Sequence, residues 1–428
     1  LHLCDRRQRQ MCIRDRVMSE RLLDKLYIGI DLKEESAMLS YFHPGMERPA
    51  TVSFVAGSSE YSLPLVVAKR HGIGQWVYGK DAERLAEAGQ GTKAENLFRQ
   101  ALNKNRITVE SREYPAEDLF LLFIKKILSI PNKLDRERKL ERLVFAVQTV
   151  TEECVRLLDR VRQELELSEE QFEVVDYKEC FCFYHCNQEE KLQNHQAGLF
   201  DGSSEKIVYY SLEKEKRTKP CVVTIKEQKL GILTDDKDAG FLAMAQQAFD
   251  KQLVSTVYFV GSAFDGGWMQ ESLKYICRGR RAFLGKNLYS LGACFVAFQK
   301  KETEREYVYL GDSEFKMNIS LKVRKKQELE FYSLVTAGEN WYLKEHSCEV
   351  ILDGTDTVEL WLQHPYGREA KIESLELADL PKRPARTTRI RITVHLLGDT
   401  KAEIEIEDLG FGELFPSSEK VWKYTMEF

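Results

Sequence analysis

Two carboxylates at the tips of expected β-hairpins are the residues best placed to do chemistry in this sequence. Asp31 ends the apolar run Leu26–Asp31, and Ala37–Phe42 resumes the apolar character after a short polar turn. Asp201 lies in Ala197–Leu212, where two apolar runs flank a Gly/Ser turn. Such runs predict core hairpins. The two carboxylates are therefore either Mg²⁺ ligands that act through water, or plain turn residues.

The turns that follow Asp31 and Asp201 in the sequence differ in how well they could bind a phosphate group. A phosphate needs backbone N–H groups within reach, which favours glycine and small hydroxyl residues. Gly202, Ser203 and Ser204 meet this requirement in the second hairpin, although Asp-Gly is also a favoured tight turn. Lys33–Glu35 fill the first turn with bulky ionic side chains. We therefore expect no phosphate at the first turn and favour a plain turn at the second.

A cluster of sulfur and imidazole groups is the candidate for a soft metal. Cys180, Cys182 and Cys186 lie near His185 and His195. Their spacing matches no common zinc pattern, and the aromatic residues between them indicate a buried element. We favour reduced core cysteines and expect no metal.

The elements that position these groups follow an alternating order. Leu143–Val150 reads as a buried strand, Thr151 as an N-cap, Cys154–Leu167 as a helix and Phe172–Val175 as the next strand. Strand, capped helix and strand in this order favour an α/β domain.

Composition narrows the class of protein. The chain has 428 residues, of which 43% are hydrophobic and 31% charged, as in ordinary globular proteins of two or three domains. No apolar run approaches the roughly 18 residues of a membrane span.

Residues 1–17 lack periodicity and an apolar signal segment, so we take Met18 as the expected start. Without that leader the net charge is −8, which argues against a nucleic-acid surface, and the default compartment is the cytoplasm.

The pattern changes after the charged stretch Lys300–Arg305, which reads as a linker. Beyond it, apolar residues recur at every second position, as in half-exposed antiparallel strands. Tyr307–Phe428 is therefore expected to be a β-sandwich. The four clearest alternating stretches are Ile319–Val323, Val358–Leu362, Ile390–Leu396 and Ala402–Glu407.

The two hairpins, together with the stretches 257–268 and 285–297, resemble the actin-like ATPase superfamily, and within it the DnaK-type chaperones. The resemblance implies that Gly261 and Ser262 contact a nucleotide, with Gly292-Ala293 where a helix packs tightly on the sheet. Ser262 stands where the family has a second glycine. Tyr177 falls where the family places the glutamate that helps to position the lytic water, and Glu179 comes two positions late.

The resemblance extends to the rest of the chain, with two losses. Residues 372–408 resemble the substrate-binding β-domain of these chaperones in their order of strand, Leu-Pro with a second proline, strand, Gly turn and strand. About sixty residues separate Asp201 from Gly261, less than half of the interval in the chaperones, so the outer part of the second lobe is expected to be missing. Barely twenty residues follow Asp408, too few for a helical lid.

These features predict an α/β actin-like two-lobe ATPase fold with a trimmed second lobe, followed by an all-β sandwich. The expected divisions are a non-native leader at 1–17, lobe I at 18–190, lobe II at 191–300, a linker at 301–306 and the β-sandwich at 307–428.

The expected function is that of a degenerate chaperone-like protein. It is expected to be non-catalytic or to bind nucleotide only weakly, and to bind polypeptide or a protein partner through its β-domain. We expect no catalytic residue, no metal site and no required cofactor, and neither nucleic acid nor membrane as partner. The candidate nucleotide contacts are Asp31, Asp201, Gly202, Ser203, Ser204, Gly261 and Ser262. An active ATPase that uses ATP and Mg²⁺, or a related kinase, is the alternative, and a filament subunit is a third.

Overall fold

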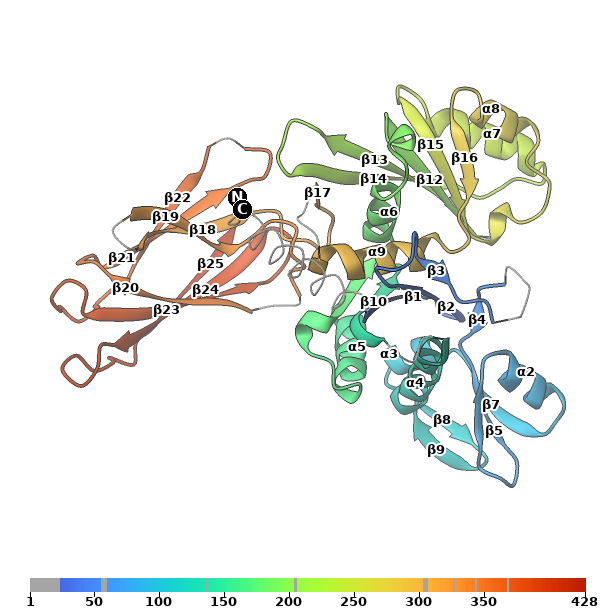
Figure 1. Cartoon of the computed structure of the whole chain (residues 1–428), viewed down its shortest axis with the longest axis horizontal. Coiled ribbons are helices and arrows are strands. Elements are labelled where there is room, and N and C mark those ends of the chain that lie inside the picture. The colour runs from blue at the N-terminus through green and yellow to red at the C-terminus, as the bar shows by residue number, and fades with distance from the viewer. Residues whose placement is uncertain are drawn as a thin grey trace, which may run out of the picture. The chain divides into compact units, whose positions relative to one another are not determined.

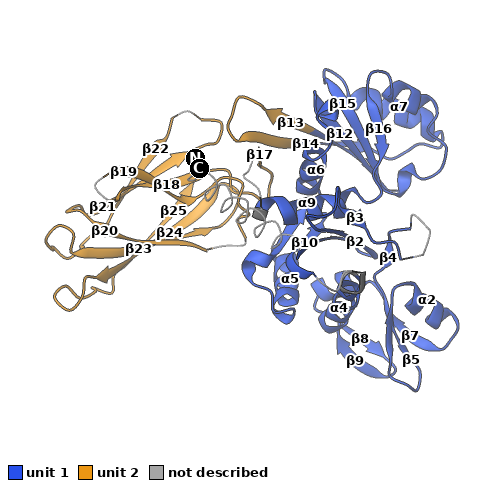
Figure 2. Ribbon diagram, viewed as in Figure 1, with its two compact units in different colours: residues 1–211, 226–304 blue, residues 212–225, 305–428 orange. Residues whose placement is uncertain are grey.

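The described chain forms two compact units, coloured separately in Figure 2. Unit 1 comprises Leu1–Ser211 and Lys226–Glu304, and unit 2 comprises Leu212–Ile225 and Arg305–Phe428, so far as these ranges are described. The computed structural model describes residues 24–54, 60–134, 138–203, 206–302, 307–325, 328–342, 345–367 and 369–428.

The first half of unit 1 is built on a mixed sheet with the order β11-β10-β1-β2-β3, in which β4 also pairs with β2. β1 and β2 form an antiparallel hairpin, and β10 and β11 continue the sheet in parallel. Helix α4 precedes β10, α5 joins β10 to β11, and α6 follows β11 (Figure 1). The bounds are β1 Lys25–Leu32, β2 Ser36–Phe42, β3 Ala50–Thr51, β4 Leu63–Pro64, β10 Lys139–Val147, β11 Phe172–Asp176, α4 Ala116–Leu134, α5 Glu152–Glu164 and α6 Tyr177–Cys186.

The second half repeats this order. Its sheet runs β16-β15-β12-β13-β14, and β15 lies parallel to both β12 and β16. β17 continues this sheet by pairing with Cys221–Val223 of β14, and these paired residues belong to unit 2. Helices α7, α8 and α9 stand in the chain where α4, α5 and α6 stand in the first half. The bounds are β12 Gln196–Gly202, β13 Ile207–Glu215, β14 Cys221–Gly231, β15 Val254–Val260, β16 Arg281–Leu284, β17 Tyr307–Tyr309, α7 Lys237–Ala248, α8 Glu271–Ile276 and α9 Leu288–Glu302.

The two halves differ in what separates the hairpin from the next core helix. In the first half this interval holds a three-stranded sheet, β6-β5-β7, a β8–β9 hairpin and two helices. In the second half only residues 232–236 lie between β14 and α7. The second half is thus the shorter one, as the interval between Asp201 and Gly261 indicates. The bounds are β5 Val67–Arg70, β6 Trp76–Tyr78, β7 Gly91–Ala94, β8 Arg106–Val109, β9 Arg112–Pro115, α2 Lys80–Glu87 and α3 Leu97–Leu102.

Local signals in the sequence account for several of these elements. β1 is buried from Leu26 to Leu32 because the sheet is covered on both faces, which explains its unbroken apolar run. The Oγ1 atom of Thr151 accepts a hydrogen bond from the backbone N–H of Cys154 at 3.3 Å and caps α5. α9 continues to Glu302, so Lys300 belongs to a helix and the expectation that it begins a linker is wrong.

Unit 2 contains two four-stranded antiparallel sheets that share one hydrophobic core. Their orders are β19-β18-β21-β22 and β20-β23-β24-β25. The four stretches with alternating apolar residues coincide with β18, β21, β23 and β24. The bounds are β18 Asn318–Lys325, β19 Glu328–Val335, β20 Glu345–Leu352, β21 Thr357–Gln363, β22 Lys371–Glu376, β23 Thr388–Leu396, β24 Lys401–Gly410 and β25 Val421–Glu427.

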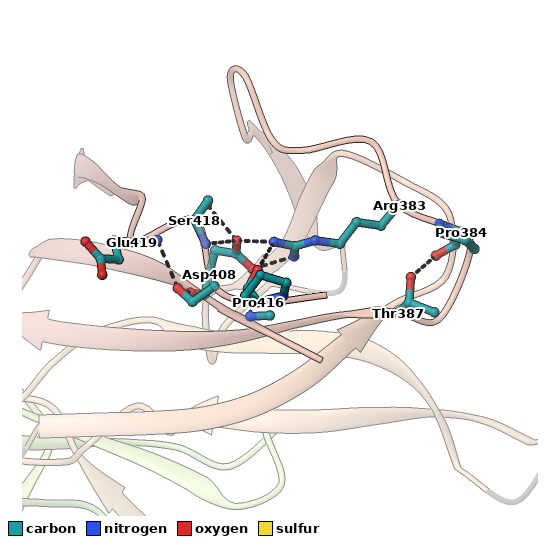
Figure 3. A network of polar contacts seen from close by, with 9 residues as sticks. Arg383, Pro384, Thr387, Asp408, Pro416, Ser418 and Glu419 are labelled. Carbon is teal, nitrogen blue, oxygen red and sulfur yellow. Dashed lines mark hydrogen bonds and ion pairs between the residues drawn. The ribbon is translucent and has the colours of Figure 1, made fainter. Parts of the chain in front are cut away.

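A buried ion pair fastens the proline-containing connection between β22 and β23 to this sandwich (Figure 3). The guanidinium of Arg383 donates two hydrogen bonds of 2.8 Å to the carboxylate of Asp408, which has no exposed surface. The backbone N–H groups of Gly410 and Ser418 donate to the same carboxylate at 2.9 Å. Burial would raise the pKa of Asp408, but these hydrogen bonds outweigh it and hold the pKa well below its usual value.

Three parts of the sequence-based predictions concern residues that the structure does not describe. The leader 1–17, Met18 and Ser204 lie outside the described residues. Among the helices that the structure describes, none combines the length and the apolar character needed to cross a membrane.

Candidate functional site

The carboxylate of Asp31 lies near the end of β1 and is almost completely buried, with 1% of its surface exposed. The hydroxyl of Tyr177, the first residue of α6, donates a hydrogen bond of 2.6 Å to Asp31 Oδ1. Burial raises the pKa of Asp31, and the charge of Lys33 and the tyrosine hydrogen bond offset only part of this rise. Tyr177, which the resemblance to the DnaK-type chaperones aligns with their glutamate, is thus a hydrogen-bond donor to the first carboxylate.

Asp201 in β12 has the same arrangement in the second half. The hydroxyl of Tyr289, in the first turn of α9, donates a hydrogen bond of 2.6 Å to Asp201 Oδ2. Asp201 is partly buried, and burial again raises the pKa of its carboxyl group. Each half of unit 1 therefore pairs the carboxylate of its hairpin with a tyrosine at the start of its last helix.

The two tyrosines also contact each other. The rings of Tyr177 and Tyr289 are stacked, with centroids 3.8 Å apart and planes inclined by 9°. Both rings are buried, and burial raises the pKa of both phenols well above the ordinary value, so both hydroxyls remain protonated donors at neutral pH. The stack joins the two carboxylates through a continuous chain of Asp31, Tyr177, Tyr289 and Asp201.

Glycines bring the backbones around this stack close together. A Cβ atom on Gly292 of α9 would lie 2.2 Å from the carbonyl oxygen of Cys180 in α6. A Cβ atom on Gly29 of β1 would lie 2.4 Å from the backbone nitrogen of Cys294 in α9. Gly292 therefore allows helix to approach helix. The expected tight packing of this helix on the sheet is confirmed at Ala293, whose backbone lies close to Gly29 of β1.

The glycines that were expected to face a nucleotide serve close backbone packing. A Cβ atom on Gly261 would lie 2.0 Å from the carbonyl oxygen of Gly202, and Gly261 has a φ of +99° that favours glycine. A Cβ atom on Gly202 would meet the side chains of Ile207 and Phe264 at 2.7 Å. The structure thus brings Gly202 and Gly261 together, and their lack of a side chain is explained without a phosphate.

The two serines of these turns stay at the surface. Ser203 is exposed, and its backbone N–H donates to the carbonyl oxygen of Lys206 at 2.9 Å, which closes the hairpin turn. Ser262 begins a short 3₁₀ turn and is also exposed. Both side chains are therefore accessible to solvent.

The three residues of the ionic turn Lys33–Glu35 differ in exposure and in their effect on the site. Glu34 and Glu35 are exposed, and Glu34 lies 4.0 Å from the guanidinium of Arg99 on the surface. Lys33 is partly buried, and its positive charge opposes the rise in the pKa of both site carboxylates. The hydroxyls of Tyr177 and Tyr289 contact the same two carboxylates. The replacement of the cradle by ionic groups stays a prediction, to which the structure adds the two tyrosines.

A second buried polar cluster lies behind the stack. Lys300 of α9 places its Nζ 2.6 Å from Glu173 Oε1 and 2.5 Å from Glu179 Oε1. Glu173 is also paired with the guanidinium of Arg142 in β10. Glu179, the glutamate that comes two positions late in the sequence, is thus the ion-pair partner of a helix lysine and is fully buried.

The described residues give no support to the soft-metal candidate. No group of three or more His, Cys, Asp or Glu residues in them is arranged to hold a metal ion. Cys180 and Cys182 are buried on α6, where burial raises the pKa of the Cys180 thiol well above its ordinary value. His185 contacts the hydroxyl of Tyr258 at 3.1 Å through Nδ1.

Tyr289 is the site residue that sequence reasoning missed. Its partner in the first half, Tyr177, was noted only as a lost glutamate. The detectable signal is positional: both tyrosines stand within the first two residues of the helix that follows the last strand of their half. Aligning the two halves against each other would have paired them.

Two models of protein families match the chain. The model described as "Family of unknown function (DUF5716) C-terminal" matches residues 48–312, which is more than half of the chain. The model described as "Domain of unknown function (DUF8552)" matches residues 314–428. No curated protein matches the chain. The chain belongs to the DUF5716 family.

Proposed function

We propose that this protein is a degenerate relative of the DnaK-type chaperones that binds polypeptide through unit 2 and does not turn over nucleotide. The observation that carries the proposal is the pair of tyrosine–aspartate hydrogen bonds with stacked rings between them. A Mg²⁺–nucleotide would need the same carboxylate oxygens and the same space. Both tyrosines would have to leave before it could bind.

The repeat within unit 1 supports the actin-like part of the proposal. Each half has a hairpin, a helix, a parallel strand, a helix, a further parallel strand and a last helix, in that order. The equivalent carboxylates, Asp31 and Asp201, stand at the same place in the two hairpins, each beside the central parallel strand. This duplicated arrangement is what an actin-like ancestor with two phosphate hairpins would leave behind.

The strand order of unit 2 supports the binding of polypeptide. Two small antiparallel sheets with one core have edge strands at both sides, and edge strands present backbone N–H and C=O groups to an added chain. The mild negative charge of the chain favours a protein partner over nucleic acid. The cysteines that the structure describes are reduced thiols, which agrees with the cytoplasm as the proposed compartment.

One observation favours the alternative of an ATPase. Asp201 is only partly buried, and the exposed Ser203 lies two residues away in a turn that keeps its glycine. Release of Tyr289 alone would then open the second hairpin to a phosphate. We regard this as the weaker proposal, since Gly202 is already in contact with the backbone of Gly261.

Two titrations of the full-length chain test the proposal. A permanently unfolded, fluorescein-labelled polypeptide should show saturable binding by fluorescence anisotropy, with the same affinity in the presence and absence of ATP–Mg²⁺. An affinity that changes several-fold with ATP–Mg²⁺, together with phosphate release that Asp201→Ala abolishes, would establish the ATPase instead. Absence of any polypeptide binding would remove the chaperone-like part.

A further inference from the structure

Unit 2 contains a cleft at one end of the sandwich, beside the edge strands of both sheets. Its volume is about 470 Å³, and its lining comes from the start of β18, the end of β21, β22 and the end of β25. The floor is apolar, formed by Met317, Leu362, Met426 and Phe428. The volume falls within the range of sites that take one or two side chains or a small ligand.

The floor can adapt to more than one side chain. Met317 and Met426 are partly buried and pack against the core of the sandwich, so they present flexible thioether chains at its surface. Methionine side chains fill irregular gaps and are common on surfaces that accept varied partners. Leu362 belongs to the buried core and gives the floor a fixed base.

The rim carries an excess of negative charge. Glu369, Glu373 and Glu427 line it, together with one lysine, Lys371, which is already paired with Glu373. His364 lies on the rim as well, and burial and the charge of Lys316 lower its pKa, so it is neutral at neutral pH. Glu369 and Glu427 are exposed and free to meet positive charges on an incoming molecule.

The edges of two sheets meet at this cleft. In the described part of unit 2, β22 pairs only with β21 and β25 pairs only with β24, so each has an edge without a strand partner. Farther along, side chains of β25 bridge the edges: Trp422 Nε1 donates to the carbonyl oxygen of Ala378 at 3.0 Å, and the Tyr424 hydroxyl donates to that of Glu376. The cleft lies beyond the hydrogen bonds of Trp422 and Tyr424. There it borders the edges of β22 and β25, whose backbone can pair with an extended chain.

We propose that this cleft binds an extended polypeptide segment whose apolar side chain enters the methionine-lined floor and whose flanking Lys or Arg residues meet Glu369 and Glu427. The proposal rests on the polypeptide binding proposed for unit 2 and assigns it a place and a sequence preference. An extended segment can pair its backbone with the strand edges, place an apolar side chain on the floor and bring positive charges to the acidic rim. A small anion or an acidic peptide cannot make all three interactions.

The test compares three fluorescein-labelled peptides on the full-length chain. Each has a Leu-Val-Leu centre, and the flanks are Lys, Glu or Ser. At low ionic strength the Lys-flanked peptide should bind at least tenfold more tightly than the Glu-flanked one. Hydrogen exchange should slow in residues 371–376 and 421–427 when the Lys-flanked peptide is bound.

Charge reversal on the rim supplies the decisive variant. Glu369→Lys combined with Glu427→Lys should weaken the Lys-flanked peptide at least tenfold and reverse the preference. Glu413→Lys is the control, because Glu413 is an exposed glutamate in the β24–β25 connection, outside the cleft lining. Melting temperatures verify folding, since both rim residues are exposed.

The outcomes separate this inference from the function on which it rests. If unfolded polypeptide binds but the rim variant changes neither affinity nor preference, the cleft is not the site and the proposed function stands. If no peptide and no unfolded polypeptide binds, both fail. Light scattering that shows a dimer dissociated by the rim variant would assign the cleft to a second copy of the chain and overturn the inference.

Discussion

Asp31 in unit 1 and Asp408 in unit 2 are both almost completely buried, yet their surroundings have opposite effects on ionisation. Asp408 accepts two hydrogen bonds from a guanidinium and others from backbone N–H groups, and its pKa is lowered. Asp31 accepts its hydrogen bond from the neutral hydroxyl of Tyr177, and its pKa is raised. The exposed fractions are nearly equal, so the sign follows from the hydrogen bonds: Asp408 accepts several, two of them from a guanidinium, whereas Asp31 accepts one from a phenol, and the charge of Lys33 offsets only part of its burial.

This difference distinguishes a carboxylate that stabilises the fold from one whose burial lowers the stability of the folded state. Asp408 fastens a loop, and its ion pair compensates for burial. Asp31 carries a burial penalty that a neutral residue of the same shape would avoid. A raised pKa inside a protein is frequent at sites that bind or once bound ligands. We therefore keep the former phosphate site of unit 1 as part of the proposal, and regard the ion pair of Asp408 in unit 2 as structural.

The largest expected effect comes from removing a charged partner in unit 1. Lys300→Met would leave Glu179 without this ion-pair partner in a fully buried position, and would take one cation from Glu173, which keeps its pair with Arg142. Breaking a buried ion pair in this way costs about 3–5 kcal/mol. Chemical denaturation followed by hydrogen exchange should locate the loss in α6 and α9. An unchanged midpoint would show that the pairs are not maintained in solution.

The corresponding change in unit 2 should cost slightly less. Arg383→Met removes the guanidinium but leaves Asp408 with hydrogen bonds from Gly410 and Ser418, so we expect a loss of about 3 kcal/mol. Because the chain has two units, the transitions need not coincide. Exchange should therefore accelerate in β23 and β24 and not in α6. The matched control is Arg386→Met, whose ion pair with Asp353 is on the surface.

Removing a neutral donor should cost less again. Tyr177→Phe keeps the stacked ring and deletes the hydroxyl, so that Asp31 loses a buried hydrogen bond worth about 1–3 kcal/mol. Tyr289→Phe should cost less, because Asp201 is partly exposed and water can replace the donor. Equal losses for the two variants, measured by urea denaturation, would contradict the difference in burial between the halves.

The smallest effect concerns pH and has opposite signs at the two carboxylates. The raised folded-state pKa of Asp31 means that its contribution to stability is present at acid pH and is lost as the pH rises through that pKa. Asp31→Asn should therefore gain stability relative to the parent between acid and neutral pH. The lowered pKa of Asp408 reverses this, since its contribution is present above about pH 4 and lost in stronger acid.

Melting temperatures between pH 2 and pH 8 are the measurement for this pair. Asp408→Asn should lose stability relative to the parent as the pH rises from 2 to about 4 and then stay level, because the contribution of Asp408 is complete above that pH. Asp31→Asn should gain stability relative to the parent only as the pH rises above about 4. Parallel curves for the two variants would show that the partners of the two carboxylates do not differ in the way described.

Much of the framework was predictable because local patterns specify it. Runs of apolar residues broken by polar turns located both hairpins, and the alternation at every second position located β18, β21, β23 and β24. Thr151 was recognised as a helix cap from its place before an amphipathic stretch, and the structure shows that hydrogen bond. These signals act over a few residues, so a single sequence reveals them.

The contents of the site were not predictable in the same way. The hydroxyl of Tyr177 donates a hydrogen bond to the carboxylate of Asp31, which lies 146 positions away in the sequence, and no local sequence pattern predicts such a contact. Lys300 was assigned to a linker because its neighbours are charged, whereas its partners lie on β11 and α6. Leu212–Ile225 was expected in the second lobe, yet it is part of unit 2. Each of these depends on tertiary packing.

Titration calorimetry of the full-length chain with ATP–Mg²⁺ addresses the central claim most directly. With both carboxylates bonded to stacked tyrosines, we predict no heat of binding with a dissociation constant below about 100 μM, where the binding free energy is on the order of −5 kcal/mol. We also predict no phosphate release. Micromolar binding with turnover that Asp201→Ala abolishes would show that the tyrosines yield to the nucleotide and that the site is active.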